Sequence, residues 1–136
     1  MKTLVIFYSL SGRTKSIANN LAAEKSCDIA EIMDIKRPGK LKAFTAGIHS
    51  SIKGKSWPIK SLNLNLLDYD HLILLSPVWA DNPPPAVNSA LELIPAGKTI
   101  DIKMVSNSGK SNCKDRLEAL ITAKGSVLES FEDIKK

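Results

Sequence analysis

Hydroxyl-bearing side chains surround a glycine near the start of the chain. Ser9, Ser11 and Thr14 lie around Gly12, directly after the apolar run 3–7 and before residues whose apolar positions recur at helical spacing. The start of a helix presents unpaired N–H groups and the positive end of the helix dipole, and a glycine lets the backbone curl closely around a ligand. The alternative is a helix capped by Ser11, but a cap needs one hydroxyl rather than three. The pattern therefore predicts a loop that binds a phosphate group.

Several other kinds of phosphate site are excluded by residues that are missing. The first loop has neither a G-x-G-x-x-G pattern nor a cysteine, so the dinucleotide fingerprint and a thiol nucleophile are absent. Tyr8 and Ser9 supply no acidic residue for a phospho-accepting receiver. The triplets 97–99 and 109–111 lack the earlier glycine of a nucleoside triphosphate loop. What remains is a loop that binds a phosphate monoester without reacting with it.

The elements that must position this loop alternate between strand and helix. Strands are predicted near residues 2–8, 28–34, 71–76, 99–106 and 126–131, and helices near 13–25, 41–53, 84–94 and 112–123. This alternation predicts an α/β fold, in which a parallel sheet carries helices on its faces and binds ligands beyond the carboxyl ends of its strands. A chain of 136 residues is expected to form a single domain, 1–136.

Three segments together resemble the flavodoxin-like proteins. Ser9-Leu10-Ser11-Gly12-Arg13-Thr14 is similar to the family's loop for the 5′-phosphate of FMN. Residues 69–79 are similar to its third strand and flavin-packing loop, and residues 102–109 to its fourth strand and flavin-contacting loop. The resemblance extends from Met1 to about Phe131. It implies a three-layer, doubly wound, five-stranded parallel sheet of order 2-1-3-4-5, with FMN as the cofactor.

The resemblance also assigns roles to residues in these loops. A flat aromatic such as Trp79 can stack on the isoalloxazine ring, although the alternative is a tryptophan packed into the core at a strand end. Peptide groups of the same loop would lie near flavin N5, where hydrogen bonding tunes the one-electron states. Arg13 would either pair with the phosphate or be exposed on the first helical turn. The third loop lacks the aromatic that often covers the other flavin face in flavodoxins, which leaves that face open.

No catalytic residue and no metal site are predicted. The full set of predicted cofactor-binding residues is Ser9, Leu10, Ser11, Gly12, Arg13, Thr14, Pro77, Val78, Trp79, Ala80, Asp81, Asn82, Ser106, Asn107, Ser108 and Gly109.

The end of the chain departs from the family pattern. Flavodoxin-like domains usually finish with a helix, but the last five residues are too few and too polar to form one, so the fold is expected to lack it. Right-handed crossovers place the helices before strands three, four and five on the face opposite the first helix. Without a final helix, the face that carries the first helix is left partly bare. In the fourth strand Ile100, Ile102 and Met104 alternate with Asp101 and Lys103, as in a strand with one face buried and the other exposed to solvent. We expect this face to be exposed or covered by a second copy, and apolar residues of the third strand favour a homo-oligomer.

The charge of the chain limits the classes of partner that it could bind. The net charge is +5, and residues 36–67 contain seven basic and no acidic residues. The ordinary interpretation of this basic segment is a solvated surface. An acidic redox partner protein, NAD(P)H or nucleic acid would also suit the segment. Because few aromatic residues accompany the basic ones, we expect no nucleic acid.

No apolar run is long enough to span a membrane, and no signal peptide is visible. Cys27 and Cys113 have neither disulfide nor metal-ligand spacing, so we expect a reduced, cytoplasmic protein. Cys113 lies near the start of a predicted helix, where one interpretation is a thiol with a lowered pKa.

Two functions remain open, with a weaker third. The chain is predicted to be a small FMN protein that carries electrons between partner proteins and needs no acid or base of its own. The alternative is an FMN-dependent oxidoreductase that takes hydride from NAD(P)H and reduces a quinone-type acceptor, which an open flavin face and a basic surface would suit. A flavin-less binding scaffold is the weaker alternative.

Overall fold

The computed structural model describes residues 2–35 and 46–136, and its five strands form one parallel sheet of order β2-β1-β3-β4-β5. The strands are β1 (Thr3–Phe7), β2 (Asp28–Glu31), β3 (His71–Pro77), β4 (Thr99–Ser106) and β5 (Val127–Lys135). The helices are α1 (Arg13–Lys25), α3 (Ile48–Ile52), α4 (Pro85–Glu92) and α5 (Lys114–Ala123), with a 3-10 turn η2 (Leu66–Asp68) before β3. The predicted fold class and strand order are confirmed.

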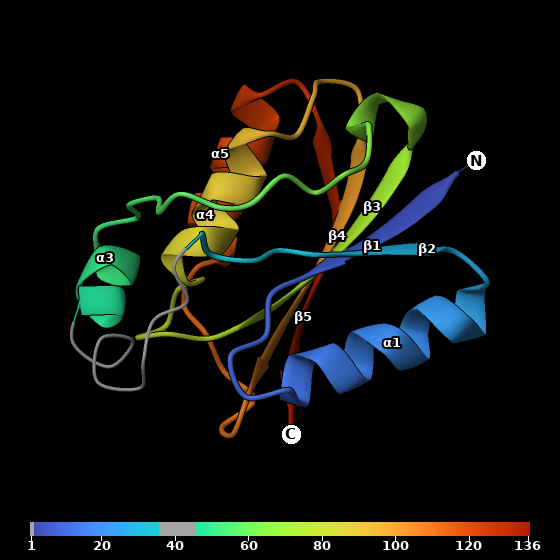
Figure 1. Ribbon diagram of the computed structural model, residues 1–136. Helices are drawn as coiled ribbons and strands as arrows, with labels where there is room; N and C mark the ends of the chain where they lie inside the picture. Colours follow the sequence, from blue (N-terminus) through green and yellow to red (C-terminus); the bar gives the residue numbers. More distant parts are fainter. Residues whose placement is uncertain (1, 36–45) are drawn as a thin grey trace.

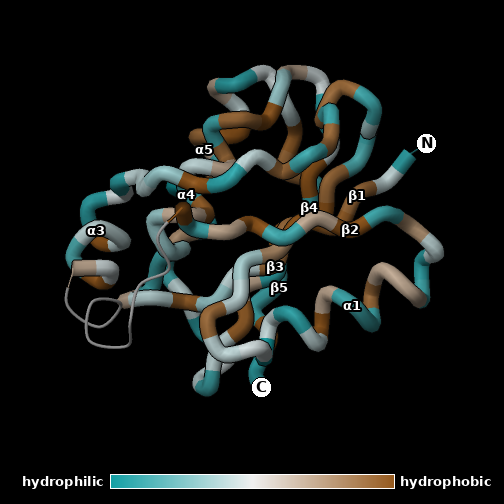
Figure 2. The backbone as a smooth tube through the Cα atoms, in the orientation of Figure 1, coloured by the Kyte–Doolittle hydropathy of each residue, from teal (hydrophilic) through white to brown (hydrophobic). Residues whose placement is uncertain are grey.

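The sheet is the middle of three layers. Helix α1 covers one face, and α4 and α5 cover the other (Figure 1). Strand β1 supplies both cores because its side chains alternate: Val5 and Phe7 pack with α1, whereas Leu4 and Ile6 pack with the cluster that includes α4 and α5. Figure 2 shows hydrophobic colouring along the central strands and hydrophilic residues on the outer sides of the helices. The predicted placement of helices on opposite faces is confirmed.

Helix α1 lies close to the sheet because small side chains form its buried side. Thr14, Ala18 and Ala22 recur every fourth residue and are all buried. Ser26 ends the helix in a left-handed conformation, and its N–H and that of Cys27 donate to carbonyls of the last turn. Because α1 follows the last residue of β1 after a short loop, its start lies at the carboxyl ends of the strands.

The face of β4 and β5 on the α1 side carries charged residues. Ile100, Ile102 and Met104 are fully buried against the α4–α5 side, and Asp101 and Lys103 lie on the other side, as predicted. Lys103 Nζ donates to Glu132 Oε1 at 2.8 Å across the two strands. The apolar residues of β3 on this side, Ile73 and Leu75, are buried beneath α1. Self-association through this face stays a prediction, but the apolar residues that favoured it are covered by the chain's own helix.

The end of the chain is the main difference from the expected elements. The fifth strand was expected to end near Phe131, but it continues to Lys135, and its pairing with β4 runs from Thr99↔Val127 to Ser106↔Lys135. The polar sequence is compatible with a strand here because β5 is an edge strand with solvent around it.

Other boundaries differ by a few residues. The second strand ends at Glu31, and Asp34 instead forms an isolated bridge with Ile59. Helices α4 and α5 are shorter than predicted, because Pro84 and Cys113 serve as their caps. Of the helix predicted at 41–53, residues 41–45 lie outside the described residues, and the described part is the five-residue α3. No helix among the described residues is both long and apolar enough to cross a membrane.

Candidate functional site

The three loops that carry the predicted site residues follow β1, β3 and β4 and meet at one edge of the sheet. The chain runs from β1 to β2 on one side and then returns to β3 on the other, so the edge lies where strand order reverses. Arg13 Nη1 donates to Asn107 Oδ1 at 2.6 Å, which ties the first loop to the third. The N–H of Asn112 donates to the carbonyl of Asp81 at 3.0 Å, which ties the second loop to the start of α5. The fold thus brings the predicted residues together.

The first loop leaves the start of α1 without a side-chain cap. Gly12 is the N-cap residue, with φ 96° and ψ −9°, a conformation that strongly favours glycine. Its N–H donates to Ser9 Oγ at 2.9 Å, so this hydroxyl shapes the loop. Ser11 is exposed and does not cap the helix, which removes the alternative interpretation. Thr14 is buried in the first turn. The N–H groups of this turn and the positive end of the dipole are therefore available to an anion.

The second loop contains a tight turn with left-handed residues. The N–H and carbonyl of Trp79 pair with the carbonyl and N–H of Asn82, at 2.7 and 3.1 Å. Ala80 and Asp81 between them have φ of 49° and 68°, which makes this a type I′ turn built without glycine. In the described part of the chain, their two N–H groups donate no hydrogen bond. Strained backbone with free donors is typical of ligand sites.

Trp79 is partly buried rather than fully exposed. Its ring meets Tyr8 edge-on, with centroids 6.1 Å apart and planes at 77°. Gly47, just before α3, approaches it so closely that a Cβ there would lie 2.5 Å from Trp79 Cζ3. The indole thus contacts the hydrophobic core while keeping some solvent exposure. Stacking on a flavin stays a prediction.

The third loop is shaped by the end of β5. Ser106 Oγ accepts from the N–H of Gly109 at 3.0 Å, and its carbonyl accepts from the N–H of Lys136 at 2.9 Å. Gly109 has φ 70°, and a Cβ on it would lie 2.8 Å from the Cβ of Lys135. Asn107 and Ser108 are exposed. The polar groups predicted to face a ligand are present, and the extended strand supports them.

Sequence reasoning missed a buried hydrogen bond next to these loops. Tyr8 Oη donates to Asp34 Oδ2 at 2.6 Å, and both side chains are buried. Tyr8 follows β1 and also contacts Trp79, so it links the end of β1 to the second loop. A tyrosine directly before a hydroxyl-rich loop is a weak signal by itself. The pairing with Asp34 depends on tertiary structure.

The position of Cys113 bears on its predicted thiol chemistry. It is buried at the start of α5, and burial raises the pKa of its thiol. The lowered pKa that its helix-start position allowed is therefore wrong, because desolvation outweighs the lowering effects of Ser111 and Arg116. Both cysteines are free.

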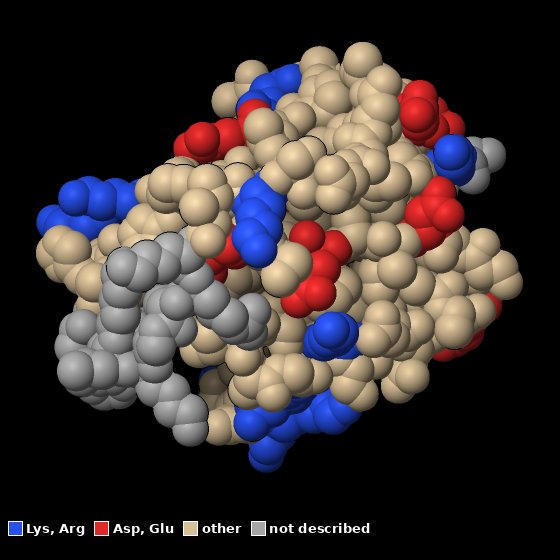
Figure 3. Space-filling model, viewed as in Figure 1, with Lys and Arg blue, Asp and Glu red and all other residues tan. Residues whose placement is uncertain are grey.

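The basic segment is only partly described. Its first four basic residues, Lys36, Arg37, Lys40 and Lys42, lie outside the described residues. Lys53, Lys55 and Lys60 are exposed. Figure 3 shows basic and acidic side chains interspersed on the face in view, so the visible surface there is not a single basic patch.

Comparison with known proteins supports the fold. No family model and no curated protein matches the chain. Among solved structures, a flavoprotein from Lactobacillus acidophilus NCFM in complex with FMN matches with TM-score 0.79 and 21% identity, covering 96% of this chain and 91% of its own. The apo form of the flavoprotein from the same organism matches with TM-score 0.70 and 19% identity, over 97% and 92%. Oxidised flavodoxin 2 from Bacillus cereus matches with TM-score 0.58 and 20% identity, over 99% and 84%. With its strand order and these structural relatives, the chain has the flavodoxin-like fold.

Proposed function

We propose that the protein binds FMN and carries electrons between partner proteins. The observation that carries this proposal is the meeting of three loops at one sheet edge, with an uncapped helix start in the first and two free N–H donors in the second. The Lactobacillus acidophilus flavoprotein, which shares the fold, was solved in complex with FMN.

The first loop suits a phosphate monoester. Residues 9–14 contain no acidic side chain, and Ser11 and Thr14 add hydroxyl donors to the N–H groups of α1. Arg13 is held by Asn107 but keeps further N–H donors for an anion. Lys15 Nζ lies 3.7 Å from Glu31 Oε1, and the lysine side chain is half exposed, so it adds little to anion binding.

The second and third loops suit the flavin ring. Trp79 offers an aromatic surface, and the N–H groups of Ala80 and Asp81 offer donors. Ser108 and Asn107 offer polar groups for the pyrimidine part. When bound, FMN supplies one- and two-electron transfer, and the residues of this chain bind and orient it.

The alternative function is reduction of a quinone-type acceptor with NAD(P)H. The net charge of +5 and a third loop without an aromatic residue favour it, because a phosphorylated nicotinamide could approach an open ring face. The weaker alternative is a scaffold that binds no flavin. Anaerobic addition of NADPH to the FMN-loaded protein separates the functions: rapid bleaching of the flavin absorbance favours the oxidoreductase, and an unchanged spectrum favours the electron carrier.

The phosphate loop is tested by comparing FMN with riboflavin. We expect FMN to bind more tightly, and Thr14→Val to weaken FMN binding roughly tenfold or more through loss of a charge-assisted hydrogen bond. Riboflavin binding should not change. Thr122→Val, at an exposed position in α5, is the matched control. Fluorescence titration of each flavin gives the dissociation constants.

Equal affinity for FMN and riboflavin in the unmodified protein would contradict the phosphate site. Absence of any flavin binding would overturn the proposed function and leave the scaffold.

A further inference from the structure

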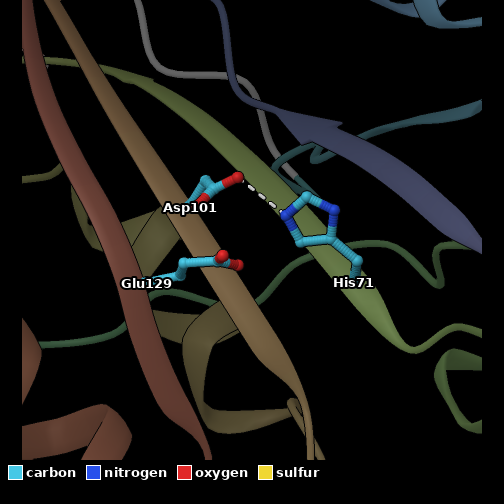
Figure 4. A group of neighbouring side chains, drawn as sticks. All are labelled: His71, Asp101 and Glu129. Atoms are coloured by element: carbon cyan, nitrogen blue, oxygen red, sulfur yellow. Dashed lines mark hydrogen bonds and ion pairs between the residues drawn. The ribbon is translucent and has the colours of Figure 1, made fainter. Parts of the chain in front are cut away.

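Three side chains of metal-binding type lie together on the side of the sheet that carries α1. His71 begins β3, Asp101 lies in β4 and Glu129 in β5, and one ligand atom from each lies within 4.8 Å of the others. Figure 4 shows the ring of His71 and the carboxylate of Asp101 pointing toward one another, with the carboxylate of Glu129 beside them. We propose that these residues bind one divalent transition-metal ion of the zinc type per chain.

Glu129 reaches this face because of a β-bulge. Asp101 pairs with Ser130, and the register shift before it leaves Glu129 as an extra residue in β5. Leu128 and Phe131 both pack against the core on the opposite side, so both residues between them face away from it. In a regular strand one of the two would face the core. Bulges commonly redirect a side chain in this way next to functional sites.

Neighbouring hydroxyls orient two of the three ligands. Ser130 Oγ donates to Asp101 Oδ1 at 2.6 Å, while Oδ2 lies 2.7 Å from Nε2 of His71. Thr3 Oγ1 lies 3.5 Å from the other ring nitrogen of His71 and offers it an acceptor when Nε2 binds a metal. Outer contacts of this kind fix the orientation of metal ligands. The side chains of His71 and Asp101 are 16% and 18% exposed, so the site is partly shielded yet open to solvent.

The donor set selects the class of ion. One imidazole nitrogen with two carboxylate oxygens suits Zn²⁺ and its neighbours, whereas Mg²⁺ and Ca²⁺ prefer oxygen ligands alone. In a tetrahedral zinc site with bonds of about 2.0–2.1 Å, ligand atoms lie about 3.3 Å apart, so Nε2 and Oδ2 need to separate by roughly 0.6 Å. Water fills the remaining position. Lys103, two residues after Asp101 in β4, is paired with Glu132, which leaves the two carboxylates to offset the ion's charge.

The site lies away from the proposed cofactor loops. His71 is the first residue of β3, whereas those loops follow the last residues of the strands. An ion here would join β3, β4 and β5 on the α1 side of the sheet, toward its β5 edge. It is therefore expected to stabilise the fold whether or not FMN is bound.

The experiment uses EDTA-treated full-length protein, titrated with Zn²⁺ by calorimetry and with Co²⁺ by visible absorption. We expect one Zn²⁺ per chain, no binding of Mg²⁺ or Ca²⁺, and no thiolate charge-transfer band with Co²⁺. The Tm should rise by at least about 3 °C with free zinc 100-fold above Kd. His71→Gln and Glu129→Gln should each weaken Zn²⁺ binding beyond the roughly 10- to 100-fold typical of losing an outer contact.

Matched controls are available in the chain. His49 is the other of the chain's two histidines and is exposed in α3, so His49→Gln should leave Zn²⁺ affinity unchanged. Glu118→Gln, at an exposed position in α5, should leave Zn²⁺ affinity unchanged. Glu129 is exposed, so Glu129→Gln tests the site even where His71→Gln impairs folding. The site is overturned by Zn²⁺ binding that survives Glu129→Gln, by loss of binding in His49→Gln, by half an ion per chain with a doubled mass, or by no binding.

Discussion

At the scale of single residues, the turn after β3 concentrates backbone strain. Ala80 and Asp81 both adopt left-handed backbone conformations, which residues with a Cβ rarely take. Asn82 Nδ2 stabilises the turn by donating to the carbonyl of Ala80 at 2.8 Å. Such strain persists only where surrounding contacts enforce it, and it is common where backbone groups face a ligand. The turn is therefore expected to lower the free energy of unfolding while presenting backbone N–H groups to a ligand.

Replacement of Ala80 by glycine tests this trade-off. Ala80→Gly should stabilise the flavin-free protein by about 0.5–1 kcal/mol, because glycine adopts positive φ without steric cost. The same change at Ala119, exposed within α5, should destabilise it by about 1 kcal/mol. Urea denaturation gives both free energies of unfolding. Equal losses in the two variants would show that the turn is not strained.

At the scale of elements, the last strand and the third loop depend on each other. Strand β5 continues four residues beyond the predicted end, and its final residues lie against Gly109 and bond to Ser106. The strand thus supports the loop that is proposed to face the flavin ring.

A comparison of two glycines measures this close approach. Gly109→Ala should cost more stability than Gly97→Ala, although both residues have positive φ. A Cβ at Gly109 would meet Lys135 at 2.8 Å, whereas one at Gly97 meets nothing within 4 Å. The common backbone cost is roughly 1 kcal/mol, and the contact with Lys135 adds to it. Thermal unfolding compares the variants; an equal decrease in Tm would mean that β5 moves aside freely.

Tyr69 links the starts of β3 and β2 in a pH-dependent way. Its hydroxyl donates to Asp28 Oδ2 at 2.7 Å, and this hydrogen bond together with burial raises the pKa of Tyr69 to about 12, from an ordinary value of 10.0. The fold therefore favours the neutral form. Its stabilising effect is complete below pH 10 and is lost as the pH rises toward 12.

The corresponding variant is Tyr69→Phe, which cannot ionise. The difference in free energy of unfolding between the unmodified protein and Tyr69→Phe should be constant up to about pH 10 and shrink between pH 10 and 12. Denaturant titrations across this range measure it. A difference that stays constant through pH 12 would contradict the raised pKa.

At the scale of the whole molecule, net charge is the feature that bears most on partners. A charge of +5 attracts anions over distances of about 10 Å at 0.1 M salt. If FMN is bound as proposed, its reduction by anionic dithionite should slow as ionic strength rises. Reduction by an uncharged photochemical reductant serves as the control. Stopped-flow absorbance gives both rates, and an identical salt dependence would mean that charge near the site is balanced.

Much of the fold follows from local patterns, and the exceptions have a common cause. Alternation between strands and helices predicted the α/β class, and the resemblance to the flavodoxin-like proteins implied the strand order. The alternation of apolar and charged residues from Ile100 to Lys103 predicted which face of β4 is polar. The predicted end of β5 was wrong because residues 132–135 have no apolar pattern of their own; they form a strand by pairing with β4.

By itself, the sequence predicted the α/β class and a phosphate-binding loop around Gly12, and its resemblance to the flavodoxin-like proteins implied the strand order. Periodicity, glycine and hydroxyl groups act within a few residues, so their consequences can be derived without knowing the rest of the molecule. Only the tertiary structure decided the surroundings of Trp79, the length of β5 and the gathering of His71, Asp101 and Glu129. Those depend on strand register and a bulge, which arise from contacts between segments far apart in the chain.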